Sequence, residues 1–279
     1  MRSRTLFRGR GIAVSEFVCD AGPQDRPFTE MHAAYSVAFV RAGSFGCRTD
    51  AAYRELVPGA ALAGRPGAEY RCTHEHHARG DECLCVELSP ELVDAVCGLD
   101  RWRAGALPPL PELVVRGGLL QAAADGRSDI AIEEAALLFA QAYARAGEAQ
   151  ARPACVDRHA RRRAVEVAHW IDDHAGEAVS LEDAAGRAGL SAFHFLRVFS
   201  ATLGVTPHQH LLRARLRRAA RLLAEEDRPI TDVALECGFA DLSNFVRTFR
   251  RAAGLPPAAF RRASRGERRI VQDALGRAA

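Results

Sequence analysis

Lysine is absent from this chain of 279 residues, so all 38 of its Lys-plus-Arg residues are arginines. Such an absence points to a compositional bias, and the abundance of arginine is therefore no evidence for any partner by itself. The sequence also lacks a run of about 18 apolar residues, which a membrane-spanning helix would need. The amino terminus, Met1-Arg2-Ser3-Arg4, is not followed by the apolar stretch of a signal peptide. We expect a soluble, cytoplasmic protein with no membrane partner.

Cysteine is not scarce, since the chain has eight. In a cytoplasmic protein of this length, they favour free thiols, metal ligands or buried small residues over disulfides. Charge divides the chain near Arg152: from there on, 22 arginines face 15 acidic residues, whereas 16 face 20 before it. A length of 279 residues has room for two domains, and we place them at residues 1–150 and 151–279.

One sequence pattern occurs twice in the basic half. Leu181-x-x-Ala184-Ala185-x-x-x-Gly189-Leu190-Ser191, with Phe195 and Phe199, returns as Ile230-x-x-Val233-Ala234-x-x-x-Gly238-Phe239-Ala240, with Phe245 and Phe249. The spacing is typical of a helix-turn-helix: a short capped helix, a glycine in the left-handed conformation, and a second helix with two phenylalanines four residues apart on its buried face. The sequence therefore predicts two copies of this unit.

The outward face of each second helix consists of the positions that remain once the phenylalanines are assigned to the buried face. They carry donor-rich and apolar side chains suited to base edges and thymine methyl groups in a major groove. A solvated surface is the alternative, but it would give no reason for an exposed phenylalanine or leucine. The candidates are Phe193, Leu196 and Arg197 in the first unit, and Leu242, Ser243, Asn244 and Arg247 in the second.

Residues 155–265 resemble the DNA-binding domain of the AraC/XylS family of bacterial transcription regulators. The family signature is matched by Arg215-Leu216-x-x-Ala219-x-x-x-Leu223, Ile230-x-x-Val233-Ala234, Gly238-Phe239, Phe245, Phe249 and Leu255-Pro256-Pro257. The resemblance implies an all-α domain with two helix-turn-helix units joined by a long helix, each unit placing its second helix in a major groove. Leu196 and Leu242 depart from the family, which often has polar residues there, and this implies fewer hydrogen bonds to bases.

The predicted joining helix runs from about Pro207 to Glu225, with Thr206 as its cap. It has an apolar stripe that can dock on both units and a second face of arginines. Among these we choose Arg215 and Arg218 as the candidate phosphate contacts. A preceding helix that begins near Asp157 is expected to close the core of the first unit.

The first half has short alternating stretches separated by glycine and proline turns, a pattern typical of a β-barrel. Helices are expected from Pro90 through Val96 and over residues 112–124 and 129–146, the last two supporting dimerisation, with a linker over residues 147–153. The chain is thus predicted to be α+β. In the AraC/XylS family such an amino-terminal half is a cupin-like barrel that senses an effector and dimerises, which implies a homodimer here.

One cluster of potential metal ligands lies in this half, between Cys72 and Cys85. If Arg79-Gly80 is a two-residue hairpin turn, the two strands place all five ligands on one face. Two histidines and two cysteines could hold zinc or another thiophilic metal, and facing thiols could respond to oxidation; inert strand core is the alternative. The candidates are Cys72, His74, His76, Cys83 and Cys85.

These observations predict a transcription regulator that binds double-stranded DNA, requires no cofactor and is not an enzyme. Its effector is a small molecule or a metal, and RNA polymerase is a candidate partner. The alternative is an enzyme carrying a DNA-binding domain: a cupin-type metalloenzyme, or a DNA-repair protein with a reactive cysteine. The former needs a complete ligand set with an open position, and the latter an activated thiol.

Overall fold

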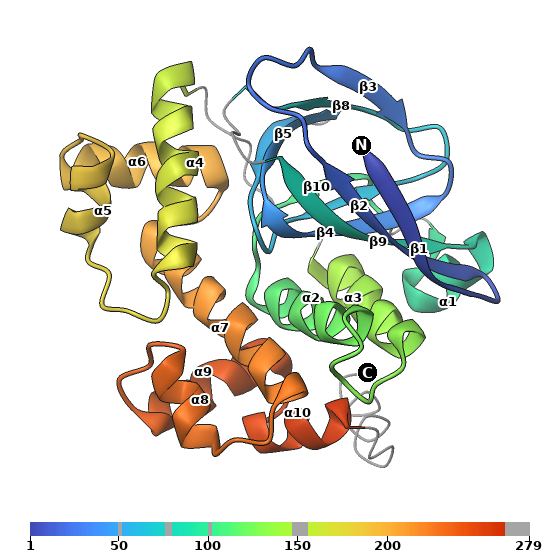
Figure 1. The fold of residues 1–279 in the computed structure, drawn as a ribbon. Helices are drawn as coiled ribbons and strands as arrows, with labels where there is room; N and C mark the ends of the chain where they lie inside the picture. Colours follow the sequence, from blue (N-terminus) through green and yellow to red (C-terminus); the bar gives the residue numbers. More distant parts are fainter. Residues whose placement is uncertain (50–51, 76–79, 100–101, 147–155, 266–279) are drawn as a thin grey trace.

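The protein is described from a computed structural model, which covers residues 1–49, 52–75, 80–99, 102–146 and 156–265. Strands dominate the first part of the chain and helices the second (Figure 1). The strands are β1 (Arg2–Gly9), β2 (Ile12–Cys19), β3 (Phe28–Met31), β4 (Tyr35–Gly43), β5 (Phe45–Thr49), β6 (Tyr53–Leu56), β7 (Ala61–Gly64), β8 (Glu69–Thr73), β9 (Asp81–Leu88) and β10 (Gly105–Leu107). The helices are α1 (Pro90–Cys97), α2 (Pro111–Ala124), α3 (Ile132–Ala146), α4 (Arg158–Asp173), α5 (Leu181–Arg187), α6 (Ala192–Leu203), α7 (Pro207–Glu225), α8 (Ile230–Glu236), α9 (Leu242–Ala253) and α10 (Pro257–Ser264).

The strands form two antiparallel sheets. One has the order β1-β2-β9-β4-β7-β10 and the other the order β3-β8-β5-β6. Side chains from both sheets, among them Val40 of β4 and Phe45 of β5, share one buried cluster, as expected for two sheets packed face to face. Among the described strands no ladder joins the two sheets. The α+β class is therefore confirmed, whereas the closure expected of a barrel is not found.

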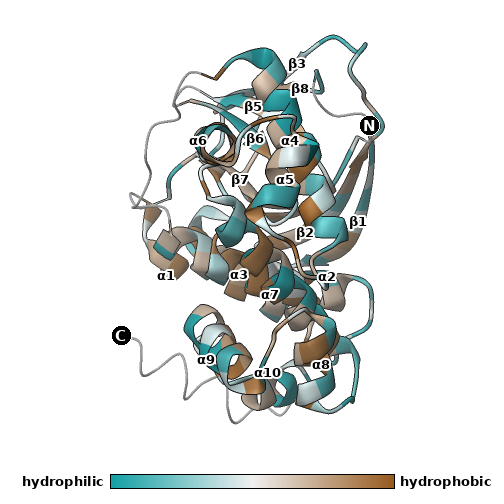
Figure 2. Ribbon diagram, turned by 90° about the vertical axis from the view of Figure 1, so that its left-hand side faces the viewer, coloured by the Kyte–Doolittle hydropathy of each residue, from teal (hydrophilic) through white to brown (hydrophobic). Residues whose placement is uncertain are grey.

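Helices α2 and α3 pack against the six-stranded sheet. Phe39 of β4 contacts Phe139 of α3, with ring centroids 5.5 Å apart, and lies so close to α2 that a Cβ on Gly117 would meet its ring at 2.2 Å. The other side of α2 packs on α7, where a Cβ on Gly118 would come within 3.0 Å of the carbonyl oxygen of Arg217. One buried cluster consequently runs from the sheet through α2 and α3 to α7 and the second helix-turn-helix unit. Figure 2 shows hydrophobic stretches of α3 and α7 in the middle of the molecule.

The helical half has the predicted elements, and its capping groups explain where they begin. Ser180 and Asp183 form both hydrogen bonds of a capping box on α5, and Thr206 and Gln209 form a second capping box on α7. Gly189 adopts the left-handed conformation between α5 and α6, with φ of 62°. Figure 1 shows α7 running from the first unit, with α4, to the second unit, with α10. None of the described helices is long and apolar enough to cross a membrane.

Polar contacts also join the two halves. The Ser44 hydroxyl lies 2.7 Å from Nε2 of His169 in α4, and Nη1 of Arg217 in α7 donates to the carbonyl oxygen of Pro58 at 2.6 Å. The predicted linker, residues 147–153, lies outside the described residues. The packing of α2 on α7 and these bonds therefore help to hold the two halves together.

Candidate nucleic-acid interface

In the first unit, helix α6 divides its side chains between core and solvent. Ser191 caps the helix by accepting a hydrogen bond from the backbone N–H of His194. Phe195 is completely buried, whereas Phe193, two residues earlier, is 77% exposed. Arg197 follows Phe193 by one helical turn and is exposed, and Leu196 is half-buried beside it. An apolar ring and a guanidinium group thus share the outward face of α6.

In the second unit, helix α9 places its candidate residues in the same way. Asp241 caps the helix, Leu242 is 40% exposed, and Ser243 and Arg247 are exposed. Asn244 is half-buried, and its Oδ1 accepts a hydrogen bond from Nη2 of Arg247 at 3.3 Å. The amide therefore limits the directions that the Arg247 guanidinium can take, which favours a fixed contact over a diffuse charge.

The candidate surface of α9 extends beyond Arg247, the last residue predicted from the sequence. Arg250 and Arg251 are exposed and, together with Leu242, Ser243, Val246, Arg247 and Gly254, line a shallow open groove. The spacing of Ser243, Arg247, Arg250 and Gly254 is four, three and four residues, which keeps them on one helical face. This spacing is visible in the sequence, although the predicted interface ended at Arg247. The groove adds two cations to the candidate surface.

The two candidate arginines of α7 form hydrogen bonds to other parts of the same chain. Arg215 donates from Nε to the carbonyl oxygen of Ala175 and from Nη2 to that of Glu177, both at 2.8 Å. Arg218 donates from Nη2 to Oε1 of Glu236 at 2.8 Å. The first arginine thus ties α7 to the loop between α4 and α5, and the second ties it to α8. Their predicted contact with phosphate stays a prediction, and the structure gives both guanidinium groups intramolecular partners.

A buried ionic group fixes α4 to α7. Oδ1 of Asp172 lies 3.0 Å from Nη2 of Arg217 and 3.4 Å from Nε2 of His210. Burial by itself would raise the pKa of Asp172, but the nearby charges of Arg217 and His210 outweigh it and hold this pKa at about 2. These contacts set the angle between the first unit and the joining helix.

The amino-terminal candidates lie in two different sheets, and the hairpin register expected around Arg79-Gly80 is wrong. Strand β8 pairs with β3 and β5, whereas β9 pairs with β2 and β4. Since β8 ends at Thr73, the two strands do not reach a two-residue turn, and the chain passes from one sheet to the other between them. Cys72, His74, Cys83 and Cys85 nevertheless line one cavity between the sheets. His76 lies outside the described residues.

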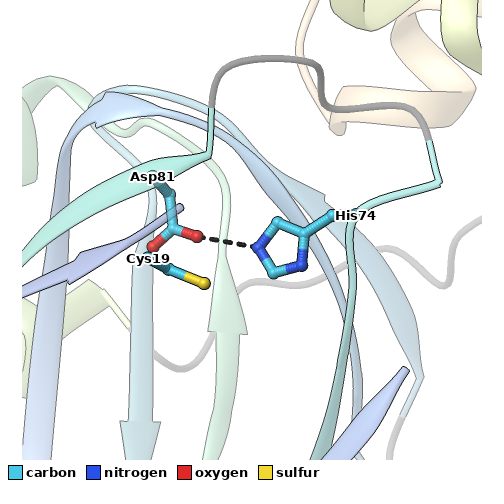
Figure 3. A group of neighbouring side chains, drawn as sticks. All are labelled: Cys19, His74 and Asp81. Atoms are coloured by element: carbon cyan, nitrogen blue, oxygen red, sulfur yellow. Dashed lines mark hydrogen bonds and ion pairs between the residues drawn. The ribbon is translucent and has the colours of Figure 1, made fainter. Parts of the chain in front are cut away.

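Three side chains in this cavity form a tighter cluster than the expected set (Figure 3). One sulfur, nitrogen or oxygen atom from each of Cys19, His74 and Asp81 lies within 4.8 Å of the others. Nε2 of His74 lies 3.0 Å from Oδ1 of Asp81. Cys19 and Asp81 are paired residues on the neighbouring strands β2 and β9. Neither Cys19 nor Asp81 was predicted as a ligand, because their proximity depends on a pairing between strands far apart in the chain.

The cavity thiols are poor nucleophiles as they stand. Burial raises the pKa of Cys85 to about 12, with a smaller contribution from Glu87. Burial and the charge of Asp81 raise the pKa of Cys83 well above its ordinary value. A reactive thiol needs a lowered pKa and a nearby cation, so these two do not suit the reactive cysteine of a repair protein.

Comparisons with known proteins agree with the helical half. A helix-turn-helix domain model matches residues 184–263. The probable transcriptional regulator LumQ of Photobacterium leiognathi is 35% identical over 34% of this chain and 39% of its own length. The transcriptional activator RhaS of Salmonella arizonae is 29% identical over 66% of this chain and 70% of its own. The chain thus spans well under half of LumQ.

Solved structures also resemble this chain. A transcriptional regulator with an AraC-type DNA-binding domain from Chromobacterium violaceum is 28% identical, with a TM-score of 0.37, over 40% of this chain and 99% of that one. The repeated motif, the paired helix-turn-helix units and the domain match agree: the helical half carries an AraC-type helix-turn-helix domain and is similar to that of the transcriptional regulators LumQ and RhaS.

Proposed function

We propose that this protein is a sequence-specific transcription regulator that holds two neighbouring major grooves of DNA with α6 and α9. The observation that carries the proposal is the pair of capped second helices, each with an exposed arginine and an exposed apolar side chain on its outward face. The two units lie toward opposite ends of α7 (Figure 1). The 19 residues of α7 span about 28 Å at ~1.5 Å per residue, comparable to the ~34 Å between major grooves one helical turn apart.

Residue roles follow from side-chain chemistry and remain part of the proposal. Arg197 and Arg247 are assigned to base edges, since a guanidinium group suits the paired acceptors of guanine. Phe193, Leu196 and Leu242 are assigned to thymine methyl groups, and Ser243 and Asn244 to further hydrogen bonds. Arg250 and Arg251, at the far end of the groove, suit phosphate.

A footprint on DNA tests the mode of binding. A preferred site is selected from random-sequence DNA with the full-length protein and mapped by hydroxyl-radical cleavage. Two protected segments on one face, about one helical turn apart, are expected, and affinity should fall steeply with salt because arginines displace counterions. A single protected groove, or affinity insensitive to salt, would contradict the proposal.

Replacement of Arg247 by alanine tests base reading. Loss of a bidentate contact should cost about 1–3 kcal/mol on the preferred site and relax the preference at one base pair. Arg10→Ala is the matched control, since Arg10 is exposed in the turn between β1 and β2. Affinities for the preferred site and for its single-base variants are compared. An unchanged base preference would move Arg247 from the reading residues to the phosphate contacts.

For the amino-terminal half we propose that the two sheets act as a cupin-like sensing domain and that the protein works as a homodimer without catalytic activity. The cavity between the sheets, about 110 Å³ in size, is the candidate effector site. Helix α2 has little surface left for a dimer, because it packs on the sheet and on α7. Light scattering of the purified chain measures its oligomeric state directly. A monomer at concentrations that saturate DNA would refute the proposed homodimer.

A further inference from the structure

A group of potential metal ligands lies where β2 ends and β9 begins, and none of its residues belongs to the candidate nucleic-acid interface. The Cys19 residue is 7% exposed and His74 is 3% exposed, and the Asp81 side chain is 10% exposed. Cys19 and Asp81 lie on the paired strands β2 and β9, and His74 directly follows β8 of the other sheet. A soft thiol, an imidazole and a carboxylate are a donor set that suits zinc.

The distances allow a single ion to bind all three. The donor atoms lie within 4.8 Å of one another, and ligands about 2.0–2.3 Å from a tetrahedral zinc ion lie roughly 3.3–3.8 Å apart. A contraction of about 1 Å between side chains would therefore close the site. The Cys83 thiol is near, since its Sγ lies 3.6 Å from Oδ2 of Asp81, and it or a water molecule can take the fourth position.

Two carboxylates line the cavity, those of Glu30 and Asp81. Among its described lining residues none is an arginine, and Met1 brings the positive amino terminus to the same lining. The Tyr70 hydroxyl donates to Glu30 at 2.5 Å, so Asp81 is the carboxylate that remains beside the cysteine and histidine. A divalent ion that replaces the thiol proton of Cys19, which passes to the buffer, gives a neutral site with one thiolate and one carboxylate. The ion would also replace the hydrogen bond between His74 and Asp81.

We propose that Cys19, His74 and Asp81 bind one thiophilic divalent metal ion of the zinc class, and that this ion is the effector of the amino-terminal domain. The effector role rests on the proposed regulatory function, whereas metal binding can be measured without DNA.

The structure supplies a short path from this site to the DNA-binding half. Gly80 precedes Asp81, and its carbonyl oxygen accepts a hydrogen bond from the backbone N–H of Ser44 at 3.1 Å. The Ser44 hydroxyl lies 2.7 Å from Nε2 of His169 in α4, the first helix of the basic half. Gly80 also lies close to β2, since a Cβ there would lie 2.0 Å from the carbonyl oxygen of Cys19. A displacement of Asp81 toward a metal ion would act on Ser44 and α4 through this chain of hydrogen bonds.

Metal binding is tested on the full-length protein after treatment with a chelator. Zn²⁺ is expected to bind with a stoichiometry of one per chain, and Co²⁺ to give the charge-transfer absorption of a thiolate ligand. Cys19→Ser and His74→Ala should each lower zinc affinity at least tenfold, as measured by chelator competition. Circular dichroism checks that each variant is folded. No cobalt–thiolate absorption in the folded wild type would overturn the site without reference to any variant.

Two further changes test whether the ligands are Cys19, His74 and Asp81 or the cysteines predicted from the sequence. Cys72→Ser and Cys85→Ser alter thiols that line the same cavity outside the three-residue cluster, and both should keep the zinc affinity of the wild type. Loss of zinc in these variants with retention in Cys19→Ser would overturn the assignment.

The effector role is tested separately with DNA selected by the full-length protein. Saturating Zn²⁺ should change DNA affinity on the order of tenfold, within the usual range of allosteric coupling. Ser44→Ala should keep zinc binding and reduce that change. Equal DNA affinity with and without bound Zn²⁺ overturns the effector role but leaves the metal site. Failure to select any DNA refutes the proposed function, while the zinc measurement stands.

Discussion

At the scale of single residues, two phenylalanines separated by one position on α6 have opposite surroundings. Phe195 belongs to the buried cluster of the first unit, whereas most of Phe193 faces solvent. A buried ring stabilises the fold by removing apolar surface from water. An exposed ring contributes little to folding and is available to a partner.

Replacement of Phe193 by alanine should therefore change the free energy of unfolding by no more than about 0.5 kcal/mol and weaken DNA binding by about 1 kcal/mol or more through lost apolar contact. Phe195→Ala is the matched control and should cost about 3–5 kcal/mol of stability. Denaturant unfolding and DNA titration measure the two effects. Equal destabilisation by both changes would place Phe193 in the core and remove it from the interface.

The carboxylate of Asp172 makes the free energy of unfolding depend on pH. Its pKa of about 2 lies below the ordinary value of 3.8, so its contribution to stability is complete above about pH 4 and is lost as the pH falls toward 2. Asp172→Asn should lower the free energy of unfolding at neutral pH by about 3–5 kcal/mol, since it leaves Arg217 buried without its charge partner. It should also flatten the acid dependence between pH 4 and 2. Glu69→Gln, at an exposed carboxylate, is the control, and an unaltered acid profile in D172N would disprove the assignment.

At the scale of elements, the helices were predictable and the sheet pairing was not. Helix α7 begins at Pro207 and ends at Glu225, as the capping residues and the apolar stripe indicate, because both signals are local in sequence. The partners of β9 depend on contacts with β2 and β4, which lie far away in the chain. Alternation assigns a face to each residue but not a neighbouring strand. For this reason alternation could group four of the cavity candidates on one face, whereas the proximity of Cys19 to Asp81 was not predictable from it.

The arginines of α7 give a prediction about how elements are joined. Arg215→Ala removes two hydrogen bonds to backbone carbonyl oxygens and should cost about 1–3 kcal/mol of stability, with weaker binding to all DNA sequences alike. Arg218→Ala removes a partly exposed ion pair and should cost about 0–1 kcal/mol. The salt dependence of DNA binding tests their predicted phosphate contacts, since loss of one contact lowers the salt slope by about 1. An unchanged slope with lowered stability would leave them as structural ties only.

At the scale of the whole molecule, the two halves are packed against each other through a shared buried cluster. Helix α2 has the β-sheet on one side and α7 on the other, so the element that carries both DNA-binding units is packed against the candidate sensing domain. A change between the sheets can reach the DNA-binding units through α2 as well as through Ser44 and His169. The orientation of the units is thereby tied to the packing of the amino-terminal half.

This packing predicts that the full chain unfolds in a single cooperative transition, because one buried cluster crosses from the sheet to the second unit. Gly118→Leu places a side chain where a Cβ already lies 3.0 Å from the backbone of α7 and should cost about 1–3 kcal/mol through overpacking. With the contact weakened, the halves should separate into two transitions in calorimetry. Gly22→Leu is the matched control, since a Cβ there meets no atom within 4 Å. Two transitions already present in the wild type, or none gained in G118L despite lowered stability, would mean that α2 does not couple the halves.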